Sequence, residues 1–154
     1  MGDLGKLFAF VELGLNAAKL EKAQPLRGLY AMEISDLLTV ESVVPKLSVT
    51  SKKQALQELA KRAQAVTGLE ERRIFDTLLE RERLGTTGVG NGIAIPHGKI
   101  AELDGLYGVF ARLEKPIDFD SVDEQPVDLV FLLLAPESAG ADHLKALARV
   151  SRLL

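Results

Sequence analysis

GTTGVGNGIAIPHGKI, which occupies residues 85–100, carries the most structural information in this 154-residue chain. Five glycines fall within fourteen of these residues. Glycine adopts backbone conformations that are closed to other residues, and it lets neighbouring groups approach closely. The β-branched, apolar residues that follow predict a brief strand over 93–95. Because Pro96 fixes the backbone angle just before His97, we expect the backbone that carries the imidazole to be rigid just beyond this strand.

His97 permits two interpretations from composition alone. A lone histidine is commonly a surface residue or a satisfied core residue, but imidazole is also the commonest acid–base group near neutral pH. The glycines do not match G-x-x-x-x-G-K-[ST], since the lysine follows the histidine, and they form no usable G-x-G-x-x-G fingerprint. Residues 88–92 are also compatible with a simple turn.

The longer string GNGIAIPHGK, residues 90–99, resembles the active-site motif of one phosphotransferase family. That family is the type-2 enzyme IIA domains of the bacterial phosphoenolpyruvate-dependent phosphotransferase system, and the nitrogen-related branch is the most similar. The resemblance extends back to LERERLG at 79–85 and forward to PVDLVF at 126–131. MEISDLL at 32–38 is similar to the usual start of nitrogen-branch proteins, so the resemblance covers about residues 32–154.

The family resemblance implies an α/β fold with a mixed β-sheet flanked by helices in a single domain over 32–154. Alternating helical and apolar strand patterns favour the same class. We expect the C-terminal part of the domain to be missing, because related domains continue with further helix and strand. Residues 1–31 are expected to form an N-terminal extension of unknown role. The sheet should be partly antiparallel, since a strand expected at 106–113 follows His97 after only a turn.

Composition excludes several classes of function. The chain has no cysteine and two histidines, which excludes a disulfide framework, a thiolate metal site and a multi-histidine site within one chain. A net charge of −3 without a basic stripe argues against nucleic acid as a partner. No apolar run is long enough to span a bilayer. We therefore expect no metal, no cofactor and no membrane insertion.

Helical periodicity predicts two helices before the glycine stretch. The first covers about 52–67 and begins at a capping box formed by Ser51 and Gln54. The second covers about 70–84, and a glycine follows each helix. Most charged residues of the second helix, Glu82 among them, are expected on its solvated face. Its buried stripe is expected to contain Ile74, Phe75, Leu78 and Leu79.

Beyond the glycine stretch we expect two strands and a last helix. The run at 127–134 is almost continuously apolar, which is typical of a central strand buried on both faces. Asp142 is expected to cap the last helix, with His143 at its first position. The apolar stripe of this helix is expected to contain Leu144, Leu147, Val150 and Leu154.

Two further residues are candidates for a site around His97. Arg81 lies at the end of the second helix. There it either complements the helix dipole or directs the N–H groups of its guanidinium at phosphate oxygens. The family resemblance implies the second role. His143 is either a structural histidine or, as the resemblance implies, the second histidine beside the phosphorylated one.

Additional donors to a phosphate are expected from the glycine stretch itself. Backbone N–H groups around Asn91 and Gly92 form one candidate set, because successive backbone N–H groups bind anions. The hydroxyl groups of Thr86 and Thr87 form the other.

The resemblance implies a cytoplasmic phosphoryl carrier. A neutral His97 has a free lone pair that attacks a phosphoryl group in line, and the implied donor is a small HPr-like phosphocarrier protein. In the nitrogen branch, the phosphorylated and unphosphorylated forms bind different regulatory target proteins. The alternative is a sugar-specific, fructose- or mannitol-type enzyme IIA that passes the phosphate to a IIB domain. A hydrolase is disfavoured because neither a pair of carboxylates nor a G-x-S-x-G motif with a nucleophilic serine lies near His97 in sequence.

Overall fold

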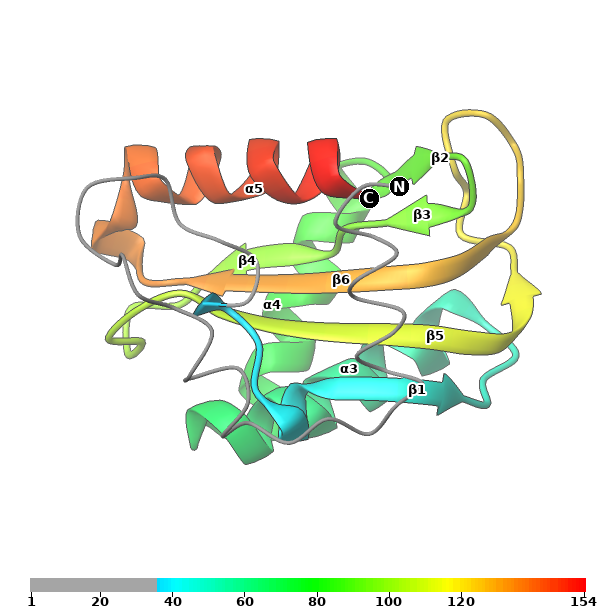
Figure 1. The fold of residues 1–154 in the computed structure, drawn as a ribbon. Helices are drawn as coiled ribbons and strands as arrows, with labels where there is room; N and C mark the ends of the chain where they lie inside the picture. The colour runs from blue at the N-terminus through cyan, green and yellow to red at the C-terminus, as the bar shows by residue number, and fades with distance from the viewer. Residues whose placement is uncertain (1–35) are drawn as a thin grey trace.

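The computed structural model describes residues 36–154, so the predictions for residues 1–31 and for the MEIS start lie outside the described part. A six-stranded mixed sheet has α3 and α4 on one face and α5 on the other (Figure 1). The elements in chain order are η2 (Val40–Ser42), β1 (Val43–Leu47), α3 (Lys52–Thr67), α4 (Glu71–Leu84), β2 (Gly88–Gly90), β3 (Ile93–Ala94), β4 (His97–Lys99), β5 (Tyr107–Ile117), β6 (Val127–Ala135), η3 (Glu137–Ala139) and α5 (Ala141–Leu153).

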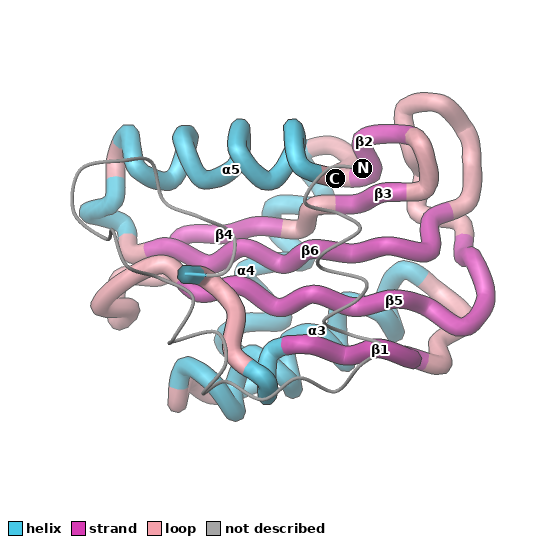
Figure 2. The backbone as a smooth tube through the Cα atoms, in the orientation of Figure 1, coloured by secondary structure: helices cyan, strands magenta, loops and turns pink. Residues whose placement is uncertain are grey.

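The α/β fold class and the mixed, partly antiparallel sheet are confirmed, but β5 does not pair with β4, the strand that precedes it. β5 pairs antiparallel with β6 rather than with β4, and β3 and β4 pair parallel with the other edge of β6 (Figure 2). β6 therefore lies between β4 and β5. The physical reason is that the most apolar strand gains most from neighbours on both edges and from burial on both faces.

Alternating side chains of β6 belong to two separate cores. Val130, Leu132 and Leu134 pack with the side chains of α3 and α4. Phe131 and Leu133 pack with the side chains of α5 on the opposite face. This alternation follows from the two-residue period of a strand and confirms that the run at 127–134 is buried on both faces.

The helix predicted over 52–67 has those bounds in the structure. The Ser51 Oγ accepts a hydrogen bond from the Gln54 N–H at 3.2 Å. The Gln54 side chain accepts from the Thr50 N–H at 2.8 Å, so the capping box is displaced by one residue from the expected Ser51 partner. Gly68 ends the helix in the left-handed region at φ 76°, where glycine is favoured. Within residues 36–154, none of the helices is long and apolar enough to cross a membrane.

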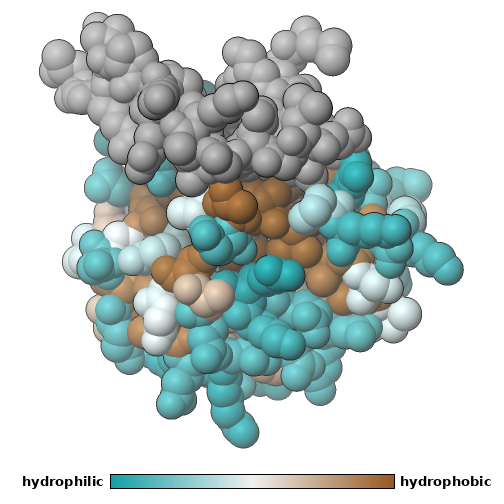
Figure 3. All heavy atoms as spheres, turned by 60° about the horizontal axis from the view of Figure 1, so that its bottom comes forward, coloured by the Kyte–Doolittle hydropathy of each residue, from teal (hydrophilic) through white to brown (hydrophobic). Residues whose placement is uncertain are grey.

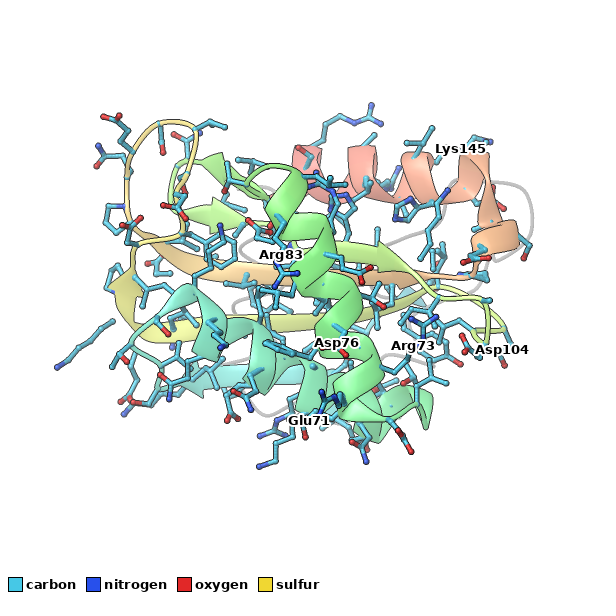
Figure 4. The ribbon with its side chains drawn as sticks, turned by 180° about the vertical axis from the view of Figure 1, so that it is seen from behind. Glu71, Arg73, Asp76, Arg83, Asp104 and Lys145 are labelled. Carbon is cyan, nitrogen blue, oxygen red and sulfur yellow. The ribbon has the colours of Figure 1, made fainter. Side chains whose placement is uncertain are left out.

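The second helix, α4, crosses the back of the sheet (Figure 4). Of its expected apolar stripe, Ile74 and Leu78 are buried, whereas Phe75 and Leu79 are half-buried. The exposed, charged side chains labelled in Figure 4 include Arg73, Asp76 and Arg83. The amphipathic pattern of this helix is therefore confirmed, with a narrower buried stripe than expected.

The last helix, α5, differs from its prediction in register. It begins at Ala141 after Gly140, and no side chain caps it, so Asp142 is a residue of the first turn rather than the cap. His143 is consequently the third helical residue, not the first.

The inward face of α5 also differs from the expected stripe. Leu144 is 67% exposed, whereas the buried residues are His143, Ala146 and Val150. Leu147 and Leu154 are half-buried. The spacing of 143, 146 and 150 is that of one helix face, and Leu144 lies about 100° away from His143 around the axis.

Strand β1 forms one end of the sheet. Its Pro45 and Lys46 are exposed, and these residue types are typical of edge strands because they discourage pairing with another chain. Figure 3 brings this side of the molecule forward. Most of the visible surface of the described residues is hydrophilic, and hydrophobic side chains gather in the upper part of that surface.

Close packing of β4 against α4 depends on Gly98. A Cβ atom at Gly98 would lie 2.8 Å from the Thr77 Cγ2 atom. Gly98→Ala should therefore lower the free energy of unfolding by about 1–3 kcal/mol, as overpacking does. Thr77→Ser removes that methyl group and keeps the hydroxyl, which bonds the Arg73 carbonyl at 2.9 Å. The double variant should regain most of the loss in urea unfolding, and an equal loss in the single and double variants would contradict this packing.

Candidate phosphoryl-transfer site

His97 lies at the start of a strand of its own. β3 and β4 follow one another along the same edge of β6 (Figure 2), and Ile95 and Pro96 between them belong to neither strand. The Leu133 N–H of β6 donates to the Pro96 carbonyl at 2.9 Å, which ties this connection to the sheet. The predicted brief strand is thus β3, and His97 itself belongs to strand β4 rather than to a loop.

The hydrogen bonds of the His97 ring identify which nitrogen is nucleophilic. Nδ1 lies 2.9 Å from the Ile95 carbonyl oxygen. Because a carbonyl only accepts, Nδ1 carries the proton and Nε2 holds the lone pair. The Arg81 Nε–H donates to this Nε2 atom at 3.2 Å. The neutral ring therefore presents a nucleophilic nitrogen directly beside a guanidinium group.

Arg81 contacts both the end of its own helix and the His97 ring. It occupies the last turn of α4, where its Nη1 donates to the Gly85 carbonyl at 2.9 Å. This bond satisfies a carbonyl at the helix end, as a C-terminal cation does. The same side chain reaches His97 through Nε, so the helix end directs the guanidinium into the site.

His143 reaches the site from the opposite helix layer. Its side chain is buried, and its ring centroid lies 5.7 Å from that of His97 with the planes tilted by 51°. The Nε2 atom of His143 is buried and has no hydrogen-bond partner among the described residues. Unpaired buried polar atoms are rare in native proteins and are often functional.

Burial controls the protonation of both histidines. Desolvation lowers the pKa of His97, and the Arg81 guanidinium lowers it further, while the Ile95 hydrogen bond and the Glu82 carboxylate partly oppose the shift. Desolvation also lowers the pKa of His143, assisted by the charges of His97 and Lys99. Both rings are consequently neutral at pH 7.

The threonine hydroxyls are bound to protein acceptors in this structure. The Thr86 hydroxyl donates to the Phe119 carbonyl at 2.9 Å, and the Thr87 hydroxyl donates to the Glu82 carboxylate at 2.6 Å. Both hydroxyls therefore support the loop, and their expected role as donors to a phosphate stays a prediction.

The Asn91–Gly92 turn comes just before β3, further along the sheet than His97. Ile93, the residue after Gly92, pairs with Leu129 of β6. His97 pairs with Leu133 of the same strand. Four residues of extended strand, or about 13 Å, separate Leu129 from Leu133. The phosphate-binding role expected of the Asn91–Gly92 turn stays a prediction.

Sequence reasoning missed Glu82, which it assigned to the solvated face of the helix. The Glu82 side chain is 5% exposed and lies 2.7 Å from the Lys52 Nζ atom. A signal was present, because Glu82 continues the four-residue spacing of Ile74 and Leu78, the buried positions of α4. Among residues 36–154, no group of three or more histidine, cysteine or acidic side chains is arranged to hold a metal ion.

Comparison with known proteins agrees with this geometry. Residues 36–154 match the family described as "Phosphoenolpyruvate-dependent sugar phosphotransferase system, EIIA 2". The chain is 65% identical over 123 residues to a nitrogen regulatory protein of Bradyrhizobium diazoefficiens, with 80% of each chain covered. It is 36% identical over 124 residues to the fructose-specific EIIABC component of Bacillus subtilis, covering 80% of this chain and 20% of that one.

A solved structure has the same fold. The crystal structure of the nitrogen regulatory protein IIA-Ntr from Neisseria meningitidis superposes with a TM-score of 0.74 at 37% identity. The superposition covers 77% of this chain and 82% of the other. The sheet and helices described above are therefore those of a IIA-Ntr-like domain.

The lowered pKa values give a testable pH dependence. Because the chain has only two histidines, their imidazole NMR signals are readily assigned with His97→Ala. Both rings of the full chain should titrate with midpoints below the ordinary value of 6.5, since burial opposes their charged forms. Midpoints at or above 6.5 for both would contradict the burial of the site.

The same shifts link pH to stability. In the unfolded chain each histidine binds its proton at a higher pH than in the folded chain. The free energy of unfolding should therefore fall as pH drops from 6.5 through the lowered folded-state pKa values. Urea unfolding at pH 7 and at pH 5.5 measures this loss, and His143→Phe should reduce it.

Proposed function

The chain belongs to the type-2 enzyme IIA family of the phosphoenolpyruvate-dependent phosphotransferase system, and from this premise we propose that it is a phosphohistidine carrier loaded at His97. The observation that carries the proposal is the hydrogen-bond pattern of the ring. The Ile95 carbonyl holds the proton on Nδ1, which leaves the Nε2 lone pair facing Arg81. Nε2 is accordingly the proposed acceptor atom.

The proposed transfer moves one phosphoryl group between two imidazoles. The His97 Nε2 lone pair attacks the phosphorus atom of a phosphohistidine on the donor, and the N–P bond of the donor breaks. The leaving ring keeps the electron pair of that bond. Each ring retains its own N–H, so no proton needs to be released. Such a transfer requires mainly in-line positioning and neutralisation of the phosphoryl oxygens.

Arg81 and His143 are the proposed ligands of the phosphoryl oxygens. Once Nε2 uses its lone pair, the Arg81 Nε–H loses its acceptor and is available to a phosphoryl oxygen. The unpaired Nε2 of His143 offers a second polar contact across the 5.7 Å between the ring centroids. Hydrogen bonds between a guanidinium and phosphate are charge-assisted and about twice as strong as neutral ones.

The proposed donor is a small HPr-like phosphocarrier protein that docks on the surface around His97, and the proposed compartment is the cytoplasm. This part rests on family membership. The consequence we propose is regulatory, because a phosphate adds about two negative charges to one face and can create or abolish a contact. The greater similarity to a nitrogen regulatory protein than to a fructose-specific component favours this role.

A sugar-specific enzyme IIA is the second candidate function, and the fructose-specific relative is the observation in its favour. The two roles differ in the fate of the phosphoryl group. A loaded sugar-specific protein passes it to a fructose- or mannitol-type IIB domain, whereas a regulator retains it and changes its protein partners. Incubation of the loaded chain with such IIB domains separates the two roles.

His97 should be the only phosphorylated residue. Incubation with phosphoenolpyruvate, enzyme I and an HPr-type carrier should place one acid-labile phosphate on the chain. His97→Ala should abolish the label because it removes the Nε2 atom that is the proposed acceptor. Glu102→Gln, which changes an exposed surface pair with Arg73, is the control. Label that persists in His97→Ala would refute the assignment.

Arg81→Gln and His143→Ala should each slow loading while His97 remains the acceptor. The loss of one preorganised donor costs on the order of 10²-fold in rate. Quench-flow measurement of label incorporation, with peptide mapping of the phosphate, checks both points. An unchanged rate in both variants would return the two residues to structural roles.

A further inference from the structure

A buried carboxylate lies one residue beyond Arg81, and the proposed transfer makes no use of it. The Glu82 Oε1 atom lies 2.7 Å from the Lys52 Nζ atom and accepts the Thr87 N–H at 2.8 Å. The Oε2 atom accepts the Thr87 hydroxyl at 2.6 Å. Both polar groups that Thr87 can donate are therefore bound to one carboxylate.

The buried Glu82 carboxylate is held by partners of complementary charge and hydrogen-bonding capacity. A buried carboxylate is costly unless it is paired and hydrogen-bonded. Glu82 meets that condition with one ammonium group and two donors from Thr87. Lys52 is itself held by Asp120 at 3.3 Å and lies 5.0 Å from the centroid of the Phe119 ring. Each charge of the Lys52–Glu82 pair therefore has at least one further partner besides the other.

The backbone of Thr87 links the Glu82 carboxylate to the His97 ring by hydrogen bonds. Its carbonyl accepts the Ile95 N–H at 2.9 Å, and the Ile95 carbonyl is the acceptor for the His97 Nδ1–H. A continuous series of hydrogen bonds thus leads from the Glu82 carboxylate to the His97 ring. This series of hydrogen bonds joins the loop after α4, which contains Thr87, to the residues just before β4, which include Ile95.

We propose that Glu82 is a positioning residue of the site: held by Lys52, it fixes Thr87 and Ile95 so that His97 keeps its proton on Nδ1 and its lone pair on Nε2. Neutral imidazole exists as two tautomers, and the hydrogen bond made by one nitrogen decides which is populated. If the Ile95 carbonyl turned away, only the Arg81 Nε–H would still favour the lone pair on Nε2, and the Nε2–H form would become more populated. That form has no lone pair directed at Arg81.

The tautomer and the loading rate provide separate readouts. The ¹⁵N chemical shifts of the His97 ring in the unphosphorylated full chain at pH 8 report which nitrogen carries the proton. Only the effect on rate rests on the proposed phosphoryl transfer. A chain that takes no phosphoryl group would refute that function and leave the tautomer test intact.

Glu82→Gln removes the charge and keeps the size of the side chain. It should raise the Nε2–H population of His97 several-fold and slow loading on the order of tenfold, the change expected from the loss of about one hydrogen bond. Thr87→Val removes only the hydroxyl contact and should shift the tautomer in the same direction by less. Lys52→Met should change the tautomer and the loading rate as Glu82→Gln does. Lys52→Arg should retain the wild-type tautomer because it keeps the positive charge.

Glu102→Gln is the matched control. It neutralises another carboxylate that pairs with α4, in this case an exposed one 3.7 Å from the Arg73 Nε atom. It should leave both the ¹⁵N shifts and the loading rate unchanged. Wild-type ¹⁵N shifts in Glu82→Gln would overturn the proposal. If Glu82→Gln does not fold, Thr87→Val keeps the ion pair and decides by the same shifts.

Discussion

The burial of β6 on both faces is the constraint from which the rest of this structure follows. Val127 to Ala135 is a nearly continuous apolar strand, and removing it from water requires a helix layer on each side of the sheet. It also favours a paired strand on each edge, which β5 and the β3–β4 pair provide. The position of His97 along the sheet is then set by its register with Leu133.

The two helix layers explain how a site forms at this position. α4 approaches β4 closely because Gly98 has no side chain to separate them, and this approach brings Arg81 to the His97 ring. α5 lies on the opposite face and contributes His143. Residues from three separate segments therefore meet at one edge of β6.

The electrostatic character of this site suits a neutral nucleophile. Burial and the nearby guanidinium both lower the pKa of His97, so the lone pair is retained at neutral pH. The same guanidinium that disfavours a proton on the ring favours an anionic group attached to it. One arrangement thus keeps His97 reactive before transfer and stabilises the proposed phosphoryl form afterwards.

Local patterns in the sequence were sufficient for the helix over 52–67 and for the buried strand over 127–134. These two predictions succeeded because each depends on residues within one or two turns of the chain. His97 stood out as a candidate through its proline and glycine neighbours, while Arg81 and His143 were added through the family resemblance.

The tertiary structure alone decided which of the remaining groups share the site. Asn91 and Gly92 are close to His97 along the chain, but only the structure shows that extended strand lies between them, with Ile93 beside Leu129 and His97 beside Leu133 of β6. Sequence reasoning placed Glu82 in solvent because charged helix residues usually lie there, but Lys52 meets it in the interior. The four-residue spacing after Ile74 and Leu78 marked Glu82 as an inward position, but its partner Lys52 and the register of the strands are long-range properties that no local pattern of residues contains.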